Sequence, residues 1–201
     1  TPTEDIPQDE VPKEDGQEIP PDVTFDPDDI PKRVKYYVND VPVSIINERV
    51  QYLDADGKLI TESLVDYTRK NIRKAYATLD EFLQRWNGAQ KKTAIVEELE
   101  QKGIFFEELR EEISKDLDPF DLICHIAFDM PPLTRKERAN NVKKRDFFSK
   151  YSGVAREVLE ALLDKYMNTG IYEIEKTEIL KLDPFPKLGK PAKIAGYFGG
   201  K

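Results

Sequence analysis

The spacing of hydrophobic residues changes along the chain, from a strand-like pattern near the beginning to a helical pattern in the rest. Between residues 34 and 61, β-branched and aromatic residues dominate, and the sequence DADG at 54–57 is a turn signal between two strand-like runs. We therefore predict a short antiparallel sheet or hairpin. A calcium-binding EF-hand loop is the alternative, but its alignment puts Tyr52 and Ser63 where that loop requires carboxylates.

From about residue 61 to residue 169, apolar residues recur every three or four positions, which is the period of a helix. The clearest amphipathic helix spans residues 153–168 and is closed by Gly170. A tail rich in Gly and Pro follows it. The predicted fold is mainly α: a helical bundle of about six helices with a small N-terminal β-hairpin or sheet and a disordered or extended acidic arm.

Two helix starts have the spacing of a capping box, in which a Thr caps the helix and a Glu three residues later caps the Thr in return. Thr78 and Glu81 form the first pair, and Thr134 and Glu137 form the second. The second pair follows Pro131 and Pro132, which we expect to end the preceding helix.

Charge is unevenly distributed along the chain. Residues 1–31 hold eleven Asp or Glu against one Lys, a net charge of −10, and seven of the 14 prolines. Because the whole chain carries −8, residues 32–201 carry +2. We predict an acidic Pro-rich linker at 1–31, a short β element at 32–61 and a helical C-terminal domain at 62–201. An acidic mimic of DNA or a partner-docking arm is the alternative for the first segment.

Composition limits the class of protein. With 39% hydrophobic residues, ten Phe and nine Tyr, the chain can form a hydrophobic core. No apolar run approaches the roughly 20 residues of a membrane span, so we expect no membrane partner. The single Cys fits a reducing, cytoplasmic compartment. Because the chain begins with Thr1, we interpret it as a fragment or a processed chain.

The only Cys and the only His are neighbours, Cys124 and His125, which raises the question of a catalytic pair. Successive residues of a helix point about 100° apart, whereas a nucleophilic Cys needs its base within about 3 Å. We therefore interpret Cys124 as a small core residue and His125 as a residue at the edge of the core.

Sequence motifs of nucleotide binding and hydrolysis do not occur in the chain. It has no phosphate-binding P-loop, no G-x-G-x-x-G, no H-E-x-x-H, no C-x-x-C and no G-x-S-x-G. A nuclease site of the PD-(D/E)-x-K type lacks a strand carrying E-x-K at a plausible distance. We predict no catalytic residue, no metal site and no cofactor within these residues.

The basic run at 135–150 is the strongest candidate for a binding surface, with a net charge of +5. We expect a basic helix that continues to about residue 151. The candidate DNA- or partner-binding residues are Arg135, Lys136, Arg138, Lys143, Lys144, Arg145 and Lys150. Such a face could bind phosphates or an acidic partner. Otherwise it could simply solvate the outer side of a helix whose Val142 and Phe147 pack inward.

One stretch, FDLICHIAFDMPPLTRKERA, combines D-L, A-F, Pro-Pro and T-R-x-E-R-A in that order. The residues that carry these motifs are Asp121, Leu122, Ala127, Phe128, Pro131, Pro132, Thr134, Arg135, Glu137, Arg138 and Ala139. DADGKLIT, EFLQRW, VEELEQKG, VLEALLDKYMNTG and YFGG are further matching stretches. The chain thereby resembles, over about residues 32–200, the C-terminal region of the R (restriction) subunit of type I restriction-modification enzymes of the EcoKI and EcoEI kind.

The resemblance implies a parent that is an ATP-dependent type I site-specific deoxyribonuclease, with ATP and Mg²⁺ bound outside these residues. It implies that this region is a non-catalytic assembly domain, which docks the motor and nuclease subunit onto the methyltransferase core. The expected partners are the methyltransferase (M) and specificity (S) subunits, with DNA contacted through the complex. A DNA-contacting helical module that uses the basic helix at 135–150 is the alternative, and an independent enzyme is the third hypothesis.

Overall fold

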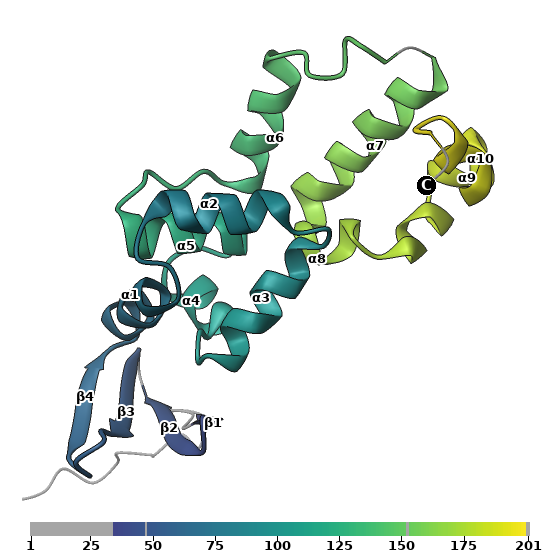
Figure 1. The fold of residues 1–201 in the computed structure, drawn as a ribbon. Helices are drawn as coiled ribbons and strands as arrows, with labels where there is room; N and C mark the ends of the chain where they lie inside the picture. The colour runs from purple at the N-terminus through teal and green to yellow at the C-terminus, as the bar shows by residue number, and fades with distance from the viewer. Residues whose placement is uncertain (1–33, 47, 152, 200–201) are drawn as a thin grey trace, which may run out of the picture. The chain divides into compact units, whose positions relative to one another are not determined.

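The computed structural model describes residues 34–46, 48–151 and 153–199, so the predicted linker at 1–31 lies outside the described residues. Within these ranges, four strands are followed by ten α-helices and a 3-10 helix (Figure 1). Six of the helices have ten residues or more, and the other four are shorter. The prediction of a mainly α protein of about six helices with a small N-terminal sheet is confirmed.

The strands form one antiparallel sheet in the order β1-β2-β3-β4. Their bounds are β1 (Val34–Val38), β2 (Val41–Ile46), β3 (Arg49–Leu53) and β4 (Leu59–Ser63). Asn39 and Asp40 both have positive φ, as the two-residue turn between β1 and β2 requires. The DADG sequence forms the turn between β3 and β4, in which the Asp54 carboxylate accepts hydrogen bonds from the backbone N–H groups of Asp56 and Lys58.

The helices follow the sheet without a further strand among the described residues. They are α1 (Leu64–Ala75), α2 (Leu79–Gly88), α3 (Lys92–Gln101), α4 (Phe106–Glu112), α5 (Pro119–Phe128), α6 (Arg135–Lys144), α7 (Val154–Thr169), α8 (Ile171–Ile174), the 3-10 helix η2 (Thr177–Lys181), α9 (Phe185–Leu188) and α10 (Pro191–Gly196). Gly170 closes α7 with a positive φ, as the sequence predicts.

The capping boxes are confirmed at one helix and only half present at the other. The Thr134 side chain accepts from the backbone of Glu137, and the Glu137 carboxylate accepts from the backbone of Thr134. At α2, Thr78 accepts from Glu81, but the Glu81 carboxylate reaches back to the N–H of Ala77 instead. The second hydrogen bond of the box is therefore made to the backbone N–H of Ala77, one residue before the cap Thr78.

The helix α5 ends at Phe128, because Asp129 adopts a left-handed conformation (φ 53°) two residues before Pro131. The exposed carbonyl groups at its end are satisfied from α1. Arg69 Nε donates to the carbonyl of Ile126 and Arg73 Nε to that of Ala127, each at 2.7 Å. These bonds fix α1 across the C-terminal end of α5.

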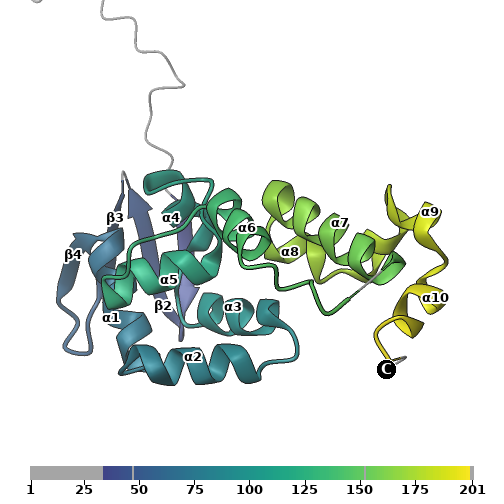
Figure 2. The same cartoon turned by 90° about the horizontal axis from the view of Figure 1, so that it is seen from above.

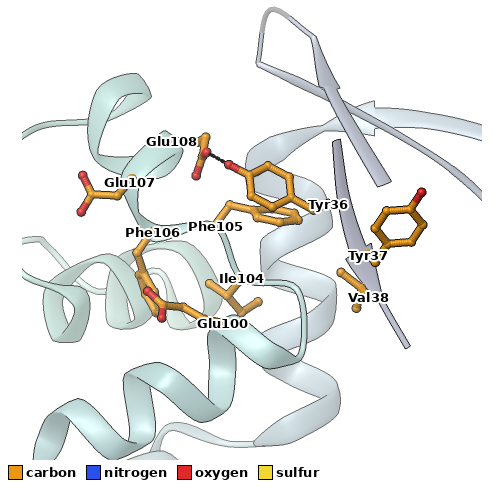
Figure 3. A pocket seen from close by; sticks show the side chains of 9 residues that line it. All are labelled: Tyr36, Tyr37, Val38, Glu100, Ile104, Phe105, Phe106, Glu107 and Glu108. Carbon is orange, nitrogen blue, oxygen red and sulfur yellow. Dashed lines mark hydrogen bonds between the residues drawn. The ribbon is translucent and has the colours of Figure 1, made fainter. Parts of the chain in front are cut away.

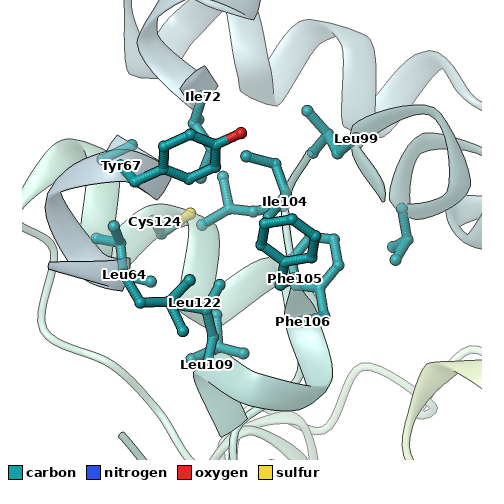
Figure 4. Close-up of a cluster of buried hydrophobic side chains, with 14 of the residues drawn as sticks. Leu64, Tyr67, Ile72, Leu99, Ile104, Phe105, Phe106, Leu109, Leu122 and Cys124 are labelled. Carbon is teal, nitrogen blue, oxygen red and sulfur yellow. The ribbon is translucent and has the colours of Figure 1, made fainter. Parts of the chain in front are cut away.

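The larger hydrophobic core joins the sheet to α1–α5. Figure 4 shows the part of it where α1, α3, α4 and α5 meet. Leu64, Tyr67 and Ile72, which share one face of the predicted first helix, are all buried in it. Phe82 and Phe106 are among its largest fully buried side chains. This core therefore holds the sheet and the first five helices together.

A smaller second core lies along α7, in the part of the chain where Gly and Pro are frequent (Figures 1 and 2). Val158 of α7 packs there with Ile179, Phe185 and Ile194. The sequence analysis describes this part only as a tail rich in Gly and Pro. In the structure η2, α9 and α10 each contribute one of these buried residues to the core.

Candidate functional site

The basic helix α6, the strongest candidate surface in the sequence, is held at its start by two sets of hydrogen bonds. The capping box at Thr134 satisfies the first backbone groups. The N–H of Arg135 donates to the carbonyl of Asp116 at 3.0 Å, in the loop before α5. The beginning of α6 is therefore fixed against the chain that precedes α5.

A buried ion pair fixes the same helix one turn further on. Arg138 donates from Nε to one oxygen of Asp121 at 2.9 Å and from a terminal nitrogen to the other at 2.6 Å. The Asp121 side chain is 3% exposed and also accepts from the backbone N–H of Leu133. The guanidinium of Arg138 lies 4.8 Å from the ring centroid of Phe120. A bidentate pair of this kind specifies both position and orientation.

A second polar contact, after that of Arg138 with Asp121, joins Asp118 at the start of α5 to the end of α7. Burial raises the pKa of its carboxyl, while hydrogen bonds from the Tyr166 hydroxyl and the backbone of Ile171 oppose that shift. Burial also raises the pKa of Tyr166, and the nearby Asp118 raises it further. Gly170 has a φ of +76°, and a Cβ at that position would lie 2.5 Å from Asp118 Oδ1. Only Gly fits this close approach.

The third contact is a helix cap supplied from a distant part of the chain. Lys91, which precedes α3, makes no side-chain cap. Instead Glu175, just after α8, accepts from the backbone N–H of Lys92 at 2.7 Å and from that of Thr93 at 3.0 Å. A carboxylate at a helix N-terminus is favourable both as an acceptor and as a negative charge. The contacts of Asp118 and Glu175 therefore tie the part of the chain that forms the second core to the first core.

The predicted binding residues separate into two groups. Three of them form ion pairs within the chain, and the other four are exposed. Arg135 is largely buried beside Asp116, and Arg138 is paired with Asp121. Lys143 pairs with Asp164 of α7 at 2.7 Å. The remaining cations are exposed and form no ion pair with a described residue: Lys136, Lys144, Arg145 and Lys150. We call these four residues the outward cations.

The prediction that the basic helix continues to about residue 151 is wrong. The helix ends at Lys144, and residues 145–150 form turns in which Asp146 has a φ of +47°. Phe147 was expected to pack inward with Val142, but it is 55% exposed, whereas Val142 is partly buried as expected. The break in the helix rotates Phe147 away from the inner face, and Phe148 is partly buried instead.

The surroundings of Cys124 and His125 indicate that both residues have structural roles. Cys124 is buried in the larger core, and burial together with the charge of Asp121 raises its pKa to about 12. A thiol held in its protonated form is a poor nucleophile. His125 Nδ1 lies 3.1 Å from the carbonyl oxygen of Met130, so that nitrogen carries the hydrogen. The interpretation of Cys124 as a core residue is confirmed.

The sequence interpretation missed Asp118, Asp121, Tyr166 and Glu175. Asp121 carried a usable signal, because it is an acid in an otherwise apolar helix and requires a cation partner. Glu175 carried none, since the helix that it caps lies more than 80 positions earlier in the chain.

Comparison with known proteins places the chain in a family. Residues 62–201 match the sequence model of the family described as EcoEI R protein C-terminal. The chain belongs to this family. The type I restriction enzyme EcoAI endonuclease subunit of Escherichia coli is 54% identical over 177 residues, which are 87% of this chain. No solved structure matches the chain. The predicted relationship to the C-terminal region of R subunits is confirmed.

The match covers 22% of the EcoAI subunit, so the chain spans about a fifth of the length of the curated relative it matches. Within the described ranges, no helix is long and apolar enough to cross a membrane. Also within those ranges, no group of three or more His, Cys, Asp or Glu is arranged to hold a metal ion. The family and the geometry of α6 are therefore the main guides to function.

Proposed function

We propose that this chain is the non-catalytic assembly domain of a type I restriction endonuclease R subunit, and that it docks the ATP-dependent motor and nuclease subunit onto the methyltransferase core. The partners would be the methyltransferase and specificity subunits, in the cytoplasm. Cleavage of DNA and the binding of ATP and Mg²⁺ would belong to the rest of the parent protein. The family match and the name of the EcoAI relative support the coarse part of this proposal.

The observation that carries the proposal is that the cations of the basic run have two roles. Some hold α6 in place, and the others are exposed. Arg135 and Arg138 hold the helix in place, so the backbone that carries Lys136 and Lys144 is fixed although both side chains are exposed. A preorganised set of charges loses less conformational entropy on binding than a mobile one. It also increases the rate of association with an acidic surface.

The test uses the full-length R subunit and the purified methyltransferase core. The variant Lys136→Glu/Lys144→Glu/Arg145→Glu should weaken binding to the core at least tenfold, measured by surface plasmon resonance. The matched control reverses three other exposed lysines with the same change in net charge: Lys58→Glu/Lys74→Glu/Lys91→Glu. Equal binding by the two triple variants would disprove docking through α6.

Direct DNA contact is the second candidate, and the exposure of Phe147 favours it. Phe147 lies between Lys144, Arg145 and Lys150, and Lys150 Nζ lies 5.2 Å from the ring centroid of Tyr151. Exposed rings among cations suit nucleic-acid backbones and bases. If DNA binds here, replacing Lys144, Arg145 and Lys150 by Gln should reduce the slope of log K against log salt by about 3. An unchanged slope would exclude this candidate.

A further inference from the structure

The edge strand β1 has backbone groups available for another strand. Among the residues that the structure describes, it pairs only with β2. In a two-residue hairpin the closing pair, here Val38 and Val41, exchanges hydrogen bonds, and the bonding then alternates along the ladder. Tyr37 is therefore in a non-bonded pair, which agrees with its partner Pro42 having no N–H. The N–H and C=O groups of Lys35 and Tyr37 consequently point away from β2.

A pocket of about 320 Å³ lies beside this strand, between β1 and residues 104–108 (Figure 3). Its apolar lining includes Val38, Ile104, Phe105 and Phe106. Tyr37 also lines it and is 75% exposed. A free strand edge beside an apolar pocket is the combination by which extended peptides are bound, because the edge supplies main-chain hydrogen bonds and the pocket selects a side chain.

The rim of the pocket is acidic. Glu100, Glu107 and Glu108 line it, and Glu108 accepts a hydrogen bond from the Tyr36 hydroxyl. Burial and repulsion from its acidic neighbours, Glu107 and Glu108 among them, raise the pKa of Glu100. Arg110 pairs with Glu107, but that carboxylate remains exposed. Accumulated negative charge around an apolar pocket favours a cationic occupant.

The same charge argues against the other occupants. A second copy of the chain would bring its own acidic rim to the edge. The acidic sequence 1–31, with a net charge of −10, would be repelled as well. A partner with a Lys or Arg two positions from an apolar residue complements the edge, the pocket and the rim at once, because residues two apart in a strand point to the same face.

We propose that the free edge of β1 and the adjacent pocket bind an extended segment of a partner protein in which Lys or Arg stands two residues from an apolar residue. The segment adds a fifth strand to the sheet, places one apolar side chain in the pocket and pairs its cations with Glu100 and Glu107. None of the outward cations takes part, so the proposal goes beyond docking through α6.

The test measures binding of a fluorescent peptide, acetyl-KTVTKTVT-amide, in which Lys and Val share one face of a strand, to the full-length protein that carries this chain, by fluorescence anisotropy. The control peptide is acetyl-ETVTETVT-amide. The basic peptide should bind at least tenfold more tightly than the acidic one. It should also slow hydrogen exchange at the amides of Lys35 and Tyr37. Equal binding of the two peptides, or unchanged exchange at both amides, would overturn the proposal.

Two pairs of variants separate the edge from the rim. Tyr37→Pro removes an outward N–H without removing a ladder bond, whereas Tyr37→Thr keeps that N–H, so only the first should weaken the peptide tenfold or more. Glu100→Lys/Glu107→Lys should do the same without touching the strand. The control Glu111→Lys changes a residue that lies on α4, as Glu107 does, but outside the pocket. It should change Kd less than twofold. Protein that dimerises through this edge instead of binding the peptide would contradict the proposal.

Discussion

The contact between Arg138 and Asp121 should contribute more stability than any exposed ion pair of the chain. Replacing Arg138 by Met keeps the apolar stem but leaves a buried carboxylate with a single backbone donor, Leu133. Breaking a buried pair from one side costs about 3–5 kcal/mol. Because the Arg138 side chain is 34% exposed, we take the lower end, about 3 kcal/mol. The reverse change, Asp121→Asn, leaves a cation that can still reach water and should cost about 2 kcal/mol.

Urea unfolding followed by circular dichroism measures these free energies in the 201-residue chain. Making both changes together, as Asp121→Asn/Arg138→Met, should cost less than the sum of the single changes by about 2 kcal/mol. Arg156→Met is the matched control, because Arg156 pairs with Asp146 and Glu160 but is 44% exposed. It should cost less than about 1 kcal/mol. If both arginine variants lose the same stability, the pair with Asp121 does not anchor α6.

Four further predictions concern the junction between the two cores and the larger core itself. Gly170→Ala should lose about 2–3 kcal/mol in the same unfolding assay, because its Cβ would meet Asp118 at a positive φ, whereas Gly88→Ala, with open space around it, should lose none. Glu175→Gln should speed hydrogen exchange at the start of α3 and cost about 1 kcal/mol; unchanged exchange would argue against the cap. Folding raises the pKa of the Asp118 carboxyl above its ordinary 3.8. The folded state therefore binds the carboxyl proton more tightly than the unfolded chain does, so ionisation of Asp118 lowers the free energy of unfolding as the pH rises. Asp118→Asn should accordingly gain stability relative to the unmodified chain as the pH rises above 3.8, and a relative loss on raising the pH would refute the assignment. Cys124, with a pKa of about 12, should react with Ellman's reagent only after unfolding; rapid reaction of the folded chain at pH 8 would contradict this.

The sequence allowed the elements to be predicted better than their contacts. Leu64 and Tyr67 recur at the helical period, so their burial follows from spacing alone. The capping box of Thr134 is likewise local, since all its atoms lie within four residues. Both features depend only on near neighbours in the chain.

The contacts of the candidate site join residues that are far apart in the sequence. The sequence therefore predicted them less well than it predicted the helices and strands. Arg138 reads as one of several surface cations until Asp121, 17 positions earlier, is known to lie beside it. Phe147 has the spacing of an inward residue, but a left-handed Asp146 ends that face before it. Asp and Asn adopt this conformation more readily than most residues, although sequence alone does not say where they do so.

The cap that Glu175 places on α3 affects how deletion experiments on this domain are interpreted. A truncation after α7 would remove Glu175 from α3 and the backbone donor at Ile171 from Asp118. It would thereby loosen the first core although, apart from the partly buried Tyr172, no residue of that core had been deleted. Loss of partner binding in such a truncation would report a weakened fold as readily as a missing contact. Surface substitutions, each paired with an unfolding measurement, are therefore the better way to map interfaces here.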